Sequence, residues 1–273
     1  MSPLTAKDRA GHHRRTIGAG WKHVLALAGI LAGSAALAAD LQVNPIMLEF
    51  APGEQSQALW LTNSGSSPLK AQVRVAAWTQ SDDEDVQTPS RDLVASPAIL
   101  EVPPGERQLV RLVRPKVGPV QTEQAYRLTV DELPQAESEA KAGLNFLLRY
   151  SIPVFVTPDD LPPLGPTRRV AEPAPVDLDA LSIQLEPSTG ETSLLRIGNP
   201  GRQRVRFSDL SWVDGAGNRI AVVPGLLGYA LAGQSRQWNI PLPASLRSRG
   251  GNLRARINDE ASDRILPLEE AGR

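Results

Sequence analysis

The sequence of 273 residues contains no cysteine, and its three histidines all occur within the first 23 positions. The rest of the chain therefore has neither a thiol nor an imidazole, which excludes Ser-His-Asp and Cys-His triads, disulfide bonds and most zinc sites. Aromatic residues amount to only 4% of the sequence, which leaves few rings to grip a sugar beside paired carboxylates. We predict that the protein is not an enzyme and that it needs neither a metal nor a cofactor.

The first 38 residues have the order of a secretory signal peptide. A basic head precedes an apolar run over residues 24–38, which ends in the small-x-small cleavage site Ala36-Leu37-Ala38. This run is shorter than the ~20 residues of a membrane-spanning helix, so we favour cleavage near Ala38 over an uncleaved anchor. We expect export to the periplasm, with no membrane insertion after cleavage. The basic head contains Lys7, Arg9, Arg14, Arg15 and Lys22.

The charge that remains after cleavage does not indicate nucleic acid as a partner. Removal of residues 1–38 takes five basic residues and one acidic residue from the 29 and 30 of the whole chain, which leaves a net charge of −5. No stripe of basic residues is evident. The acidic run Asp82-Asp83-Glu84-Asp85 lacks the Gly and the terminal Glu of a helical calcium loop. We interpret it as the solvated tip of a hairpin, with calcium binding as the alternative.

From residue 40 onward, short runs of alternating polarity are separated by turn residues, and no amphipathic helix is evident. Turn tripeptides such as Ala51-Pro52-Gly53 and Pro103-Pro104-Gly105 mark the breaks. Seven short strands in about 120 residues are typical of an immunoglobulin-like β-sandwich, which we place over residues 40–158. The expected strands are residues 43–50, 57–63, 70–79, 98–102, 107–114, 124–132 and 143–156.

A proline-rich segment over residues 159–175 indicates a stiff linker. Residues 176–273 show shorter strands between turns, which predict a second, smaller sandwich. The expected fold class is therefore all-β, with two immunoglobulin-like β-sandwich domains after the signal peptide. In the second domain the expected strands are residues 193–198, 204–212, 219–223, 235–241 and 252–258.

Two tryptophans, Trp60 and Trp78, are expected to plug the core of the first sandwich, because large buried rings dominate core energetics. A ligand platform is the alternative for both. Alternation places Ala58 and Trp60 on one face of their strand and Leu59 and Leu61 on the other.

An ordered series of motifs in the first domain resembles the PapD-like periplasmic chaperones that assemble pili, or fimbriae. The resemblance covers roughly residues 41–158, whereas the second domain matches faintly, at Asn199 with Gly201 and at residues 229–233. The family implies two such domains in an L-shaped arrangement. It also implies a chaperone that binds unfinished pilin subunits and delivers them to an outer-membrane usher. The motifs are Asn44-Pro45, Leu61-Thr62-Asn63, Trp78, Ser96-Pro97, residues 104–112, Tyr126-Arg127-Leu128, Asp131-Glu132-Leu133-Pro134 and residues 152–158.

In this family the last strand of the first domain lends alternate apolar side chains to the subunit, which is called donor-strand complementation. Leu144, Phe146 and Leu148 alternate along the expected strand and are the predicted donor residues. Burial of three such side chains stabilises a complex by about 1.5–3 kcal/mol each, before ordering costs. Leu147, on the opposite face, is expected to serve the protein's own core. The alternative is that all of these residues fill that core.

The family also holds the subunit's C-terminal carboxylate with a basic pair. That pair aligns here with Met47 and Pro153, neither of which can bind a carboxylate. The sequence resembles instead the divergent branch called archaic or alternative, whose last strand reads like residues 149–154. Arg149 is then the first candidate for the carboxylate anchor, with a snorkelling edge residue as the alternative.

Arg127 and Arg111 are the second candidates for the anchor. For both of them, a structural ion pair with Glu123 or Glu132 is the alternative. Pro153 has no N–H to donate to a ladder, so we expect the strand around it to be unpaired on one side or to lie at an edge.

Two other functions remain as alternatives. An exported immunoglobulin-like structural or adhesive pilus subunit would carry a free N-terminal donor extension and an incomplete sandwich. Here the segment after Ala38 is short and the seven expected strands are present. A secreted carbohydrate-active enzyme would need two carboxylates paired in a cleft, and the sequence offers no compelling pair.

Overall fold

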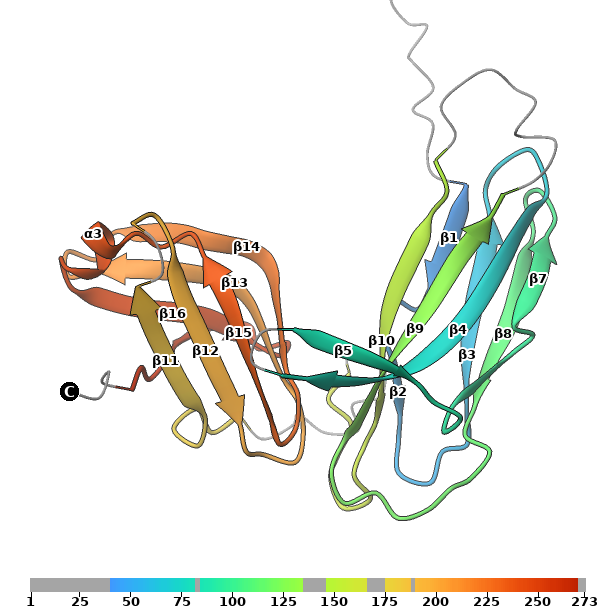
Figure 1. Cartoon of the computed structure of the whole chain (residues 1–273), viewed down its shortest axis with the longest axis horizontal. Helices are drawn as coiled ribbons and strands as arrows, with labels where there is room; N and C mark the ends of the chain where they lie inside the picture. The colour runs from blue at the N-terminus through green and yellow to red at the C-terminus, as the bar shows by residue number, and fades with distance from the viewer. Residues whose placement is uncertain (1–39, 82–83, 135–145, 166–174, 188–189, 270–273) are drawn as a thin grey trace, which may run out of the picture. The chain divides into compact units, whose positions relative to one another are not determined.

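The strands of the first part of the chain form two sheets (Figure 1). The computed structural model describes residues 40–269 apart from 82–83, 135–145, 166–174 and 188–189. One sheet has the order β1-β3-β8-β6 and the other has the order β2-β10-β9-β4-β5, with β7 also paired to β4. These strands are β1 (Leu41–Asn44), β2 (Leu48–Phe50), β3 (Ser56–Asn63), β4 (Leu69–Gln80), β5 (Asp85–Pro89), β6 (Val94–Ser96), β7 (Ile99–Val102), β8 (Arg107–Val113), β9 (Gln124–Leu133) and β10 (Arg149–Val156).

Side-chain alternation puts one row of each strand into the core of this first sandwich. Leu59 and Leu61 of β3 are buried there together with Val73 of β4, whereas Ala58 and Trp60 point outward. The alternation predicted for residues 57–61 is therefore confirmed. Burial of apolar area at about 25 cal/mol per Å² is the main force that holds the two sheets together.

Two of the expected strands of the first sandwich have wrong bounds, and two observed strands were not expected. Residues 43–50 form two strands, because β1 pairs with β3 in one sheet whereas β2 pairs with β10 in the other. The last strand begins at Arg149 rather than at residue 143. β5 and β6 were not expected, because their residues are mostly exposed and lack an apolar alternation.

The two tryptophans do not fill the core of the first sandwich, so this prediction is wrong. Trp60 lies on the outer face of β3, where the guanidinium carbon of Arg107 lies 4.5 Å from the centre of its ring. Trp78 is buried, but it packs in a separate cluster with Phe155, Tyr229 and Leu231. Both tryptophans follow the outward parity of their strands, which decides which face a residue occupies.

The second part of the chain forms a smaller sandwich of two sheets, so the expected all-β fold with two sandwiches is confirmed. Its sheets have the orders β11-β12-β15 and β14-β13-β16-β17. β11 and β17 were not expected from the sequence. The strands are β11 (Ser182–Pro187), β12 (Ser193–Asn199), β13 (Val205–Asp214), β14 (Arg219–Ala230), β15 (Gln234–Ile240), β16 (Gly251–Ile257) and β17 (Asp263–Ile265).

β14 is longer than expected because its Pro-Gly pair does not end the strand. Pairing with β13 shifts register near Ser208, so that β14 continues past Pro224 and Gly225. Gly225 has a φ of 74°, and its N–H donates a 3.0 Å hydrogen bond to the carboxylate of Asp209.

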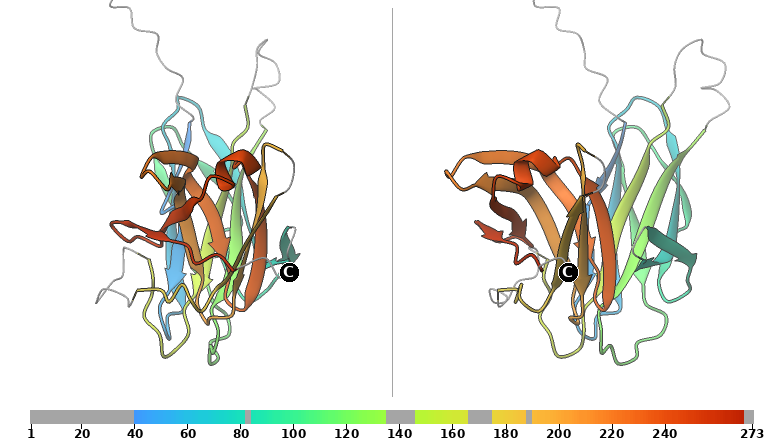
Figure 2. Two further views of the ribbon diagram at one scale, coloured as in Figure 1. Left: turned by 90° about the vertical axis from the view of Figure 1, so that its left-hand side faces the viewer. Right: turned by 60° about the vertical axis from the view of Figure 1, so that its left-hand side comes forward.

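Strands make up the body of both sandwiches in all three views (Figures 1 and 2). Among the described residues the helical content is one short turn, α3 (Ala244–Arg247). No helix in the described part of the chain is long and apolar enough to cross a membrane. Both sandwiches belong to one compact unit that spans residues 39–273.

Candidate functional site

The segment that precedes β10 exposes a large apolar side chain. Phe146 is 74% exposed and Leu147 is 47% exposed, whereas Leu148 packs in part against the core of the first sandwich. Leu147 therefore does not serve that core, and the expected assignment of the two faces is wrong at this position. Leu144 lies outside the described residues.

The row of β10 side chains that faces the core continues beyond the sandwich. Ile152 is buried, while Tyr150 and Leu148 pack partly against the same core. Phe146 follows in this row by parity and is exposed, since no strand of the described residues covers it. The same face of this segment therefore packs against the protein's own core at Ile152 and is open to solvent at Phe146.

One flank of β10 is open over part of its length. β9 pairs with β10 from Arg149 to Val156, but β2 pairs only with residues 154–156. Beside residues 149–153, no strand of the described chain occupies the second flank, so the expectation for Pro153 is confirmed. An open flank can accept the main chain of another strand.

A cavity of about 740 Å³, which we call the cleft, is lined by residues of both sandwiches. The first sandwich contributes the β1–β2 connection and residues of β4, β5, β9 and β10, and the second contributes β13, β14 and β15. Met47 and Pro153, which align with the family's basic pair, both line it. The cations of the cleft are instead Arg127, Arg206 and Arg236.

Arg127 of β9 stacks on an aromatic ring in the cleft. Its guanidinium carbon lies 3.6 Å from the centre of the Trp78 ring, a cation–π geometry. Within the described residues, Arg127 has no carboxylate at ion-pair distance. Burial lowers the pKa of the Arg127 guanidinium, and the negative charge of Asp85 partly offsets this.

Several other donors of the cleft also lack an acceptor. Within the described part of the chain, Nε1 of Trp78, Nη1 of Arg236 and Nε of Arg206 are buried without a hydrogen-bond partner. Nη2 of Arg206 is engaged, since it donates to the carbonyl of Asn258 and to the carboxylate of Asp259. Unpaired buried donors are costly, so their grouping around one cavity favours an anionic ligand.

The other two candidate anchors lie outside the cleft. Arg149 is 70% exposed in its side chain and binds Asp131, which also accepts a 2.5 Å hydrogen bond from Arg74. Burial opposes the ionisation of Asp131, but the hydrogen bonds from the two arginines lower its pKa below the ordinary value. Arg111 is exposed on β8, in the other sheet.

The alternative for Arg111 and Arg127, an ion pair with Glu123 or Glu132, is not found among the described residues. Glu123 binds Arg204, a residue of the second sandwich. The carboxylate of Glu132 accepts a 3.2 Å hydrogen bond from the N–H of Leu148.

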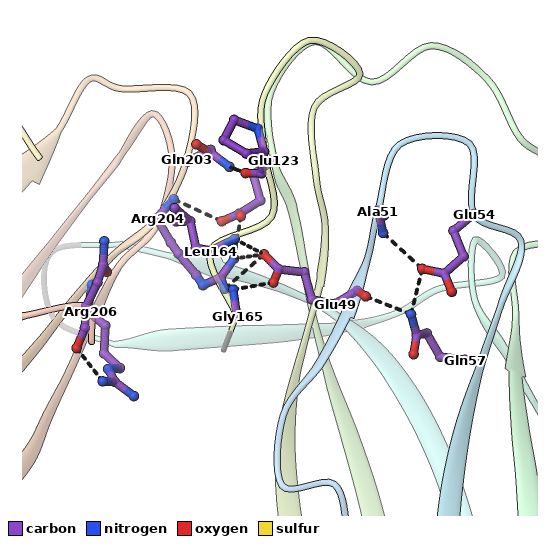
Figure 3. Close-up of polar contacts among 12 residues, drawn as sticks. Glu49, Ala51, Glu54, Gln57, Glu123, Leu164, Gly165, Gln203, Arg204 and Arg206 are labelled. Carbon is purple, nitrogen blue, oxygen red and sulfur yellow. Dashed lines mark hydrogen bonds and ion pairs between the residues drawn. The ribbon is translucent and has the colours of Figure 1, made fainter. Parts of the chain in front are cut away.

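A second polar group, which we call the junction, was missed by sequence reasoning (Figure 3). Nη1 of Arg204 lies 2.5 Å from Glu123 and 3.1 Å from Glu49, and all three side chains are almost completely buried. The only signal was a glutamate inside the apolar strand β2. Burial raises the pKa of Glu123 above its ordinary value, although the charge of Arg204 opposes this.

Backbone donors complete the junction. Glu49 accepts hydrogen bonds from the N–H groups of Leu164 (2.9 Å) and Gly165 (2.5 Å), and Glu123 accepts one from the N–H of Arg204 (2.9 Å) (Figure 3). The Arg204 guanidinium also covers the ring of Phe155, at 3.7 Å. The junction is therefore satisfied from both sandwiches and from the segment that joins them.

The sequence matches a known family over the first sandwich. Residues 40–162 match the family described as pili and flagellar-assembly chaperone, PapD N-terminal domain. The resemblance of the first sandwich to the PapD-like chaperones is therefore confirmed. Among curated proteins, none matches the sequence closely enough to count as a relative.

Solved structures of similar fold include pilus chaperones. A chain of the CsuC–CsuE chaperone–tip adhesion subunit pre-assembly complex, from the archaic chaperone-usher Csu pili of Acinetobacter baumannii, is 24% identical, with a TM-score of 0.61. The match covers 83% of the present chain and 97% of that chain. The chain is thus similar in fold to a member of the archaic branch.

Two further structures share the fold at lower identity. A chain of the Salmonella enterica SafA pilin complex with the SafB chaperone is 17% identical, with a TM-score of 0.55 and coverage of 86% and 99%. The E. coli chaperone DraB is 18% identical, with a TM-score of 0.54 and coverage of 84% and 96%. These matches extend over both sandwiches and show that the two-sandwich fold is shared.

Proposed function

We propose that the protein is a periplasmic chaperone that stabilises pilin subunits by donor-strand complementation and delivers them to an outer-membrane usher. The proposal rests chiefly on Phe146, an exposed ring three residues before β10, a strand whose second flank is partly open. A subunit that lacks its last strand can pair along residues 149–153 and take this ring into its own core. Leu148 extends the same row, and Leu144 is the third proposed donor residue.

Leu148 has a dual position in this proposal. It packs in part against the first sandwich, so it contributes less new buried area to a subunit than Phe146 does. We therefore propose Phe146 as the dominant donor residue.

We propose the cleft as the binding site for the subunit's C-terminal carboxylate, with Arg127 as the anchor. Arg127 is chosen over Arg149 and Arg111 because it lines the cleft without a carboxylate partner in the described chain, while Arg149 already binds Asp131. A buried carboxylate needs charged donors to offset its desolvation. Arg236 and Nε1 of Trp78 stand in the same cavity and can add hydrogen bonds.

Export and domain organisation belong to the same proposal. A cleaved signal peptide over residues 1–38 places the protein in the periplasm, where chaperones of this family act on subunits. The first domain is proposed to span residues 40–158, the linker 159–175 and the second domain 176–273. The relatives in solved complexes support a subunit as partner, since CsuC is bound to the tip adhesion subunit CsuE and SafB to the pilin SafA.

Co-expression with each exported pilin-like chain encoded beside the gene tests the donor mechanism. We expect a one-to-one complex, and we expect its loss when Leu144, Phe146 and Leu148 are changed together to Ser. Ile99→Ser with Ile265→Ser is the matched control, because both side chains are exposed and lie on other strands. A complex that survives the triple change, or that is equally lost in the control, contradicts the mechanism.

A further inference from the structure

The first strand of the β4–β5 hairpin is tied to the second sandwich by one glutamine. The N–H of Gln80 donates a 2.5 Å hydrogen bond to the side chain of Gln234, and its Nε2 donates a 2.7 Å bond to the carbonyl of Tyr229. Its Oε1 accepts a 2.8 Å bond from the N–H of Leu231. Gln80 pairs in register with Asp85, so these bonds fix where Asp85 stands.

Asp85 is the carboxylate that lines the cleft, among its three arginines. Its Oδ1 accepts a 3.1 Å hydrogen bond from Nε2 of Gln80 and lies 3.7 Å from Nε of Arg236. The side chain of Arg236 is 18% exposed and that of Asp85 is 35% exposed, so this pair is only partly accessible to solvent. Asp85 also acts electrostatically on Arg127.

The contact between Asp85 and Arg236 is weak in geometry. At 3.7 Å it exceeds the usual length of a charge-assisted hydrogen bond, about 2.7–2.9 Å. Nη1 of Arg236 has no partner in the described chain at all. Asp85 therefore adds negative charge beside the arginines of the cleft, but it leaves Nη1 of Arg236 without a hydrogen-bond acceptor.

We propose that Asp85 is an internal competitor for the carboxylate site: it provides the counter-charge of Arg127 and Arg236 in the free protein and lowers the affinity of the cleft for an incoming carboxylate. This inference rests on the proposed function of the cleft. The carboxylate of a ligand that enters the cleft is repelled by Asp85, because two like charges in contact cost free energy. Asp85 thus limits the strength of the anchor, as a chaperone that must release its subunit requires.

Asp85→Asn tests the competitor, with Glu84→Gln as the matched control. Both changes remove one negative charge from adjacent residues of the hairpin, but Glu84 does not line the cleft. The probe is a synthetic pentapeptide of alternating Val and Thr, once with a free C-terminal carboxylate and once as the C-terminal amide. Affinity is measured by fluorescence polarisation at low ionic strength.

We expect Asp85→Asn to strengthen binding of the carboxylate peptide about tenfold, from loss of one nearby like charge, and to leave the amide unchanged. Glu84→Gln should leave both affinities within about twofold, because an exposed charge is screened. An Asp85→Asn protein whose preference for carboxylate over amide equals that of the wild type overturns the inference.

Arg127→Met separates this inference from the proposed function. If Arg127→Met abolishes the carboxylate preference while Asp85→Asn changes nothing, the anchor stands and the competitor is rejected. If no variant, Asp85→Asn included, prefers the carboxylate to the amide, both the anchor and the competitor are rejected.

Discussion

The junction and the cleft each hold a group of charged residues, but the charges are paired in the junction and only partly paired in the cleft. In the junction, Arg204 lies between Glu49 and Glu123, and backbone N–H groups satisfy the remaining carboxylate oxygens. In the cleft, Nη1 of Arg236 and Nε1 of Trp78 have no acceptor within the described residues, and Arg236 has only a 3.7 Å contact with Asp85. Charges that are fully paired inside the protein hold its parts together, whereas charges left without partners are available to a ligand.

The largest effect is expected for Arg204→Met, which leaves two buried carboxylates without their cation. Removing one partner of a buried ion pair costs about 3–5 kcal/mol, and we expect the free energy of unfolding to fall by this amount in urea titrations. Arg202→Ala is the control, because Arg202 forms an exposed pair with Asp160 and should matter far less. Equal losses in the two variants would contradict the distinction between buried and exposed pairs.

Arg127→Met is expected to separate binding from stability. A hydrogen bond to a charged group is worth about 1.5–3 kcal/mol, so binding of a subunit should weaken by roughly 10- to 100-fold. The free energy of unfolding should fall by only about 0.5–1 kcal/mol, the worth of the cation–π contact with Trp78. Arg149→Met and Arg111→Met, measured in the same pull-down titration, should retain binding, and loss of binding in either of them instead places the anchor there.

Gly165→Ala tests the contribution of a backbone donor to the junction. A Cβ at this position would stand 2.5 Å from Oε2 of Glu49, so the carboxylate must move and lose its hydrogen bond. We expect the protein to lose about 1–3 kcal/mol of stability, the cost of a poorly satisfied buried group. Gly118→Ala is the control, since nothing lies within 4 Å of a Cβ there; a similar loss in both variants argues against the role of Glu49.

The smallest effect is a pH dependence that comes from Glu123. Its folded-state pKa is raised by burial, so the folded protein binds a proton more tightly than the unfolded chain does. The contribution of Glu123 to stability is therefore fully present below its ordinary pKa of 4.5 and is lost as the pH rises through the raised value.

Glu123→Gln removes this titration and should flatten that part of the profile of unfolding free energy against pH. The slope from one proton cannot exceed about 1.4 kcal/mol per pH unit. Asp263 serves as an internal contrast, because hydrogen bonds from Arg219 and Arg254 lower its pKa to about 2, and its contribution is lost only as the pH falls toward that value. An unchanged profile in Glu123→Gln refutes the role assigned to Glu123.

Alternation made the first sandwich predictable from local sequence. Leu59 and Leu61 lie in the core as their parity indicates, since side chains of a strand point to opposite faces at every second residue. The same rule puts Trp60 and Trp78 outside that core, so parity rather than ring size decides their face. Trp78 is buried only because Tyr229 and Leu231, far along the chain, cover the outer face of its sheet.

The candidate site was less accessible to sequence reasoning. Phe146, whose ring is exposed, lies in the expected last strand and was predicted as a donor residue from its alternation. The start of that strand at Arg149 was not predicted. Arg127 was a second candidate, behind Arg149, on the sequence alone. Only the tertiary structure favours it, because residues of both sandwiches line the cleft in which Arg127 lies.

The sequence by itself determined the β class, the turns, the alternating core rows and the resemblance of the first sandwich to a known family. Each of these depends on residues close together in the chain, whose spacing matches the two-residue period of a strand. Only the tertiary structure decided which charges are paired and which are available. Arg204 meets Glu49 across 155 positions and Glu123 across 81, and burial at such contacts depends on the whole fold rather than on any local pattern.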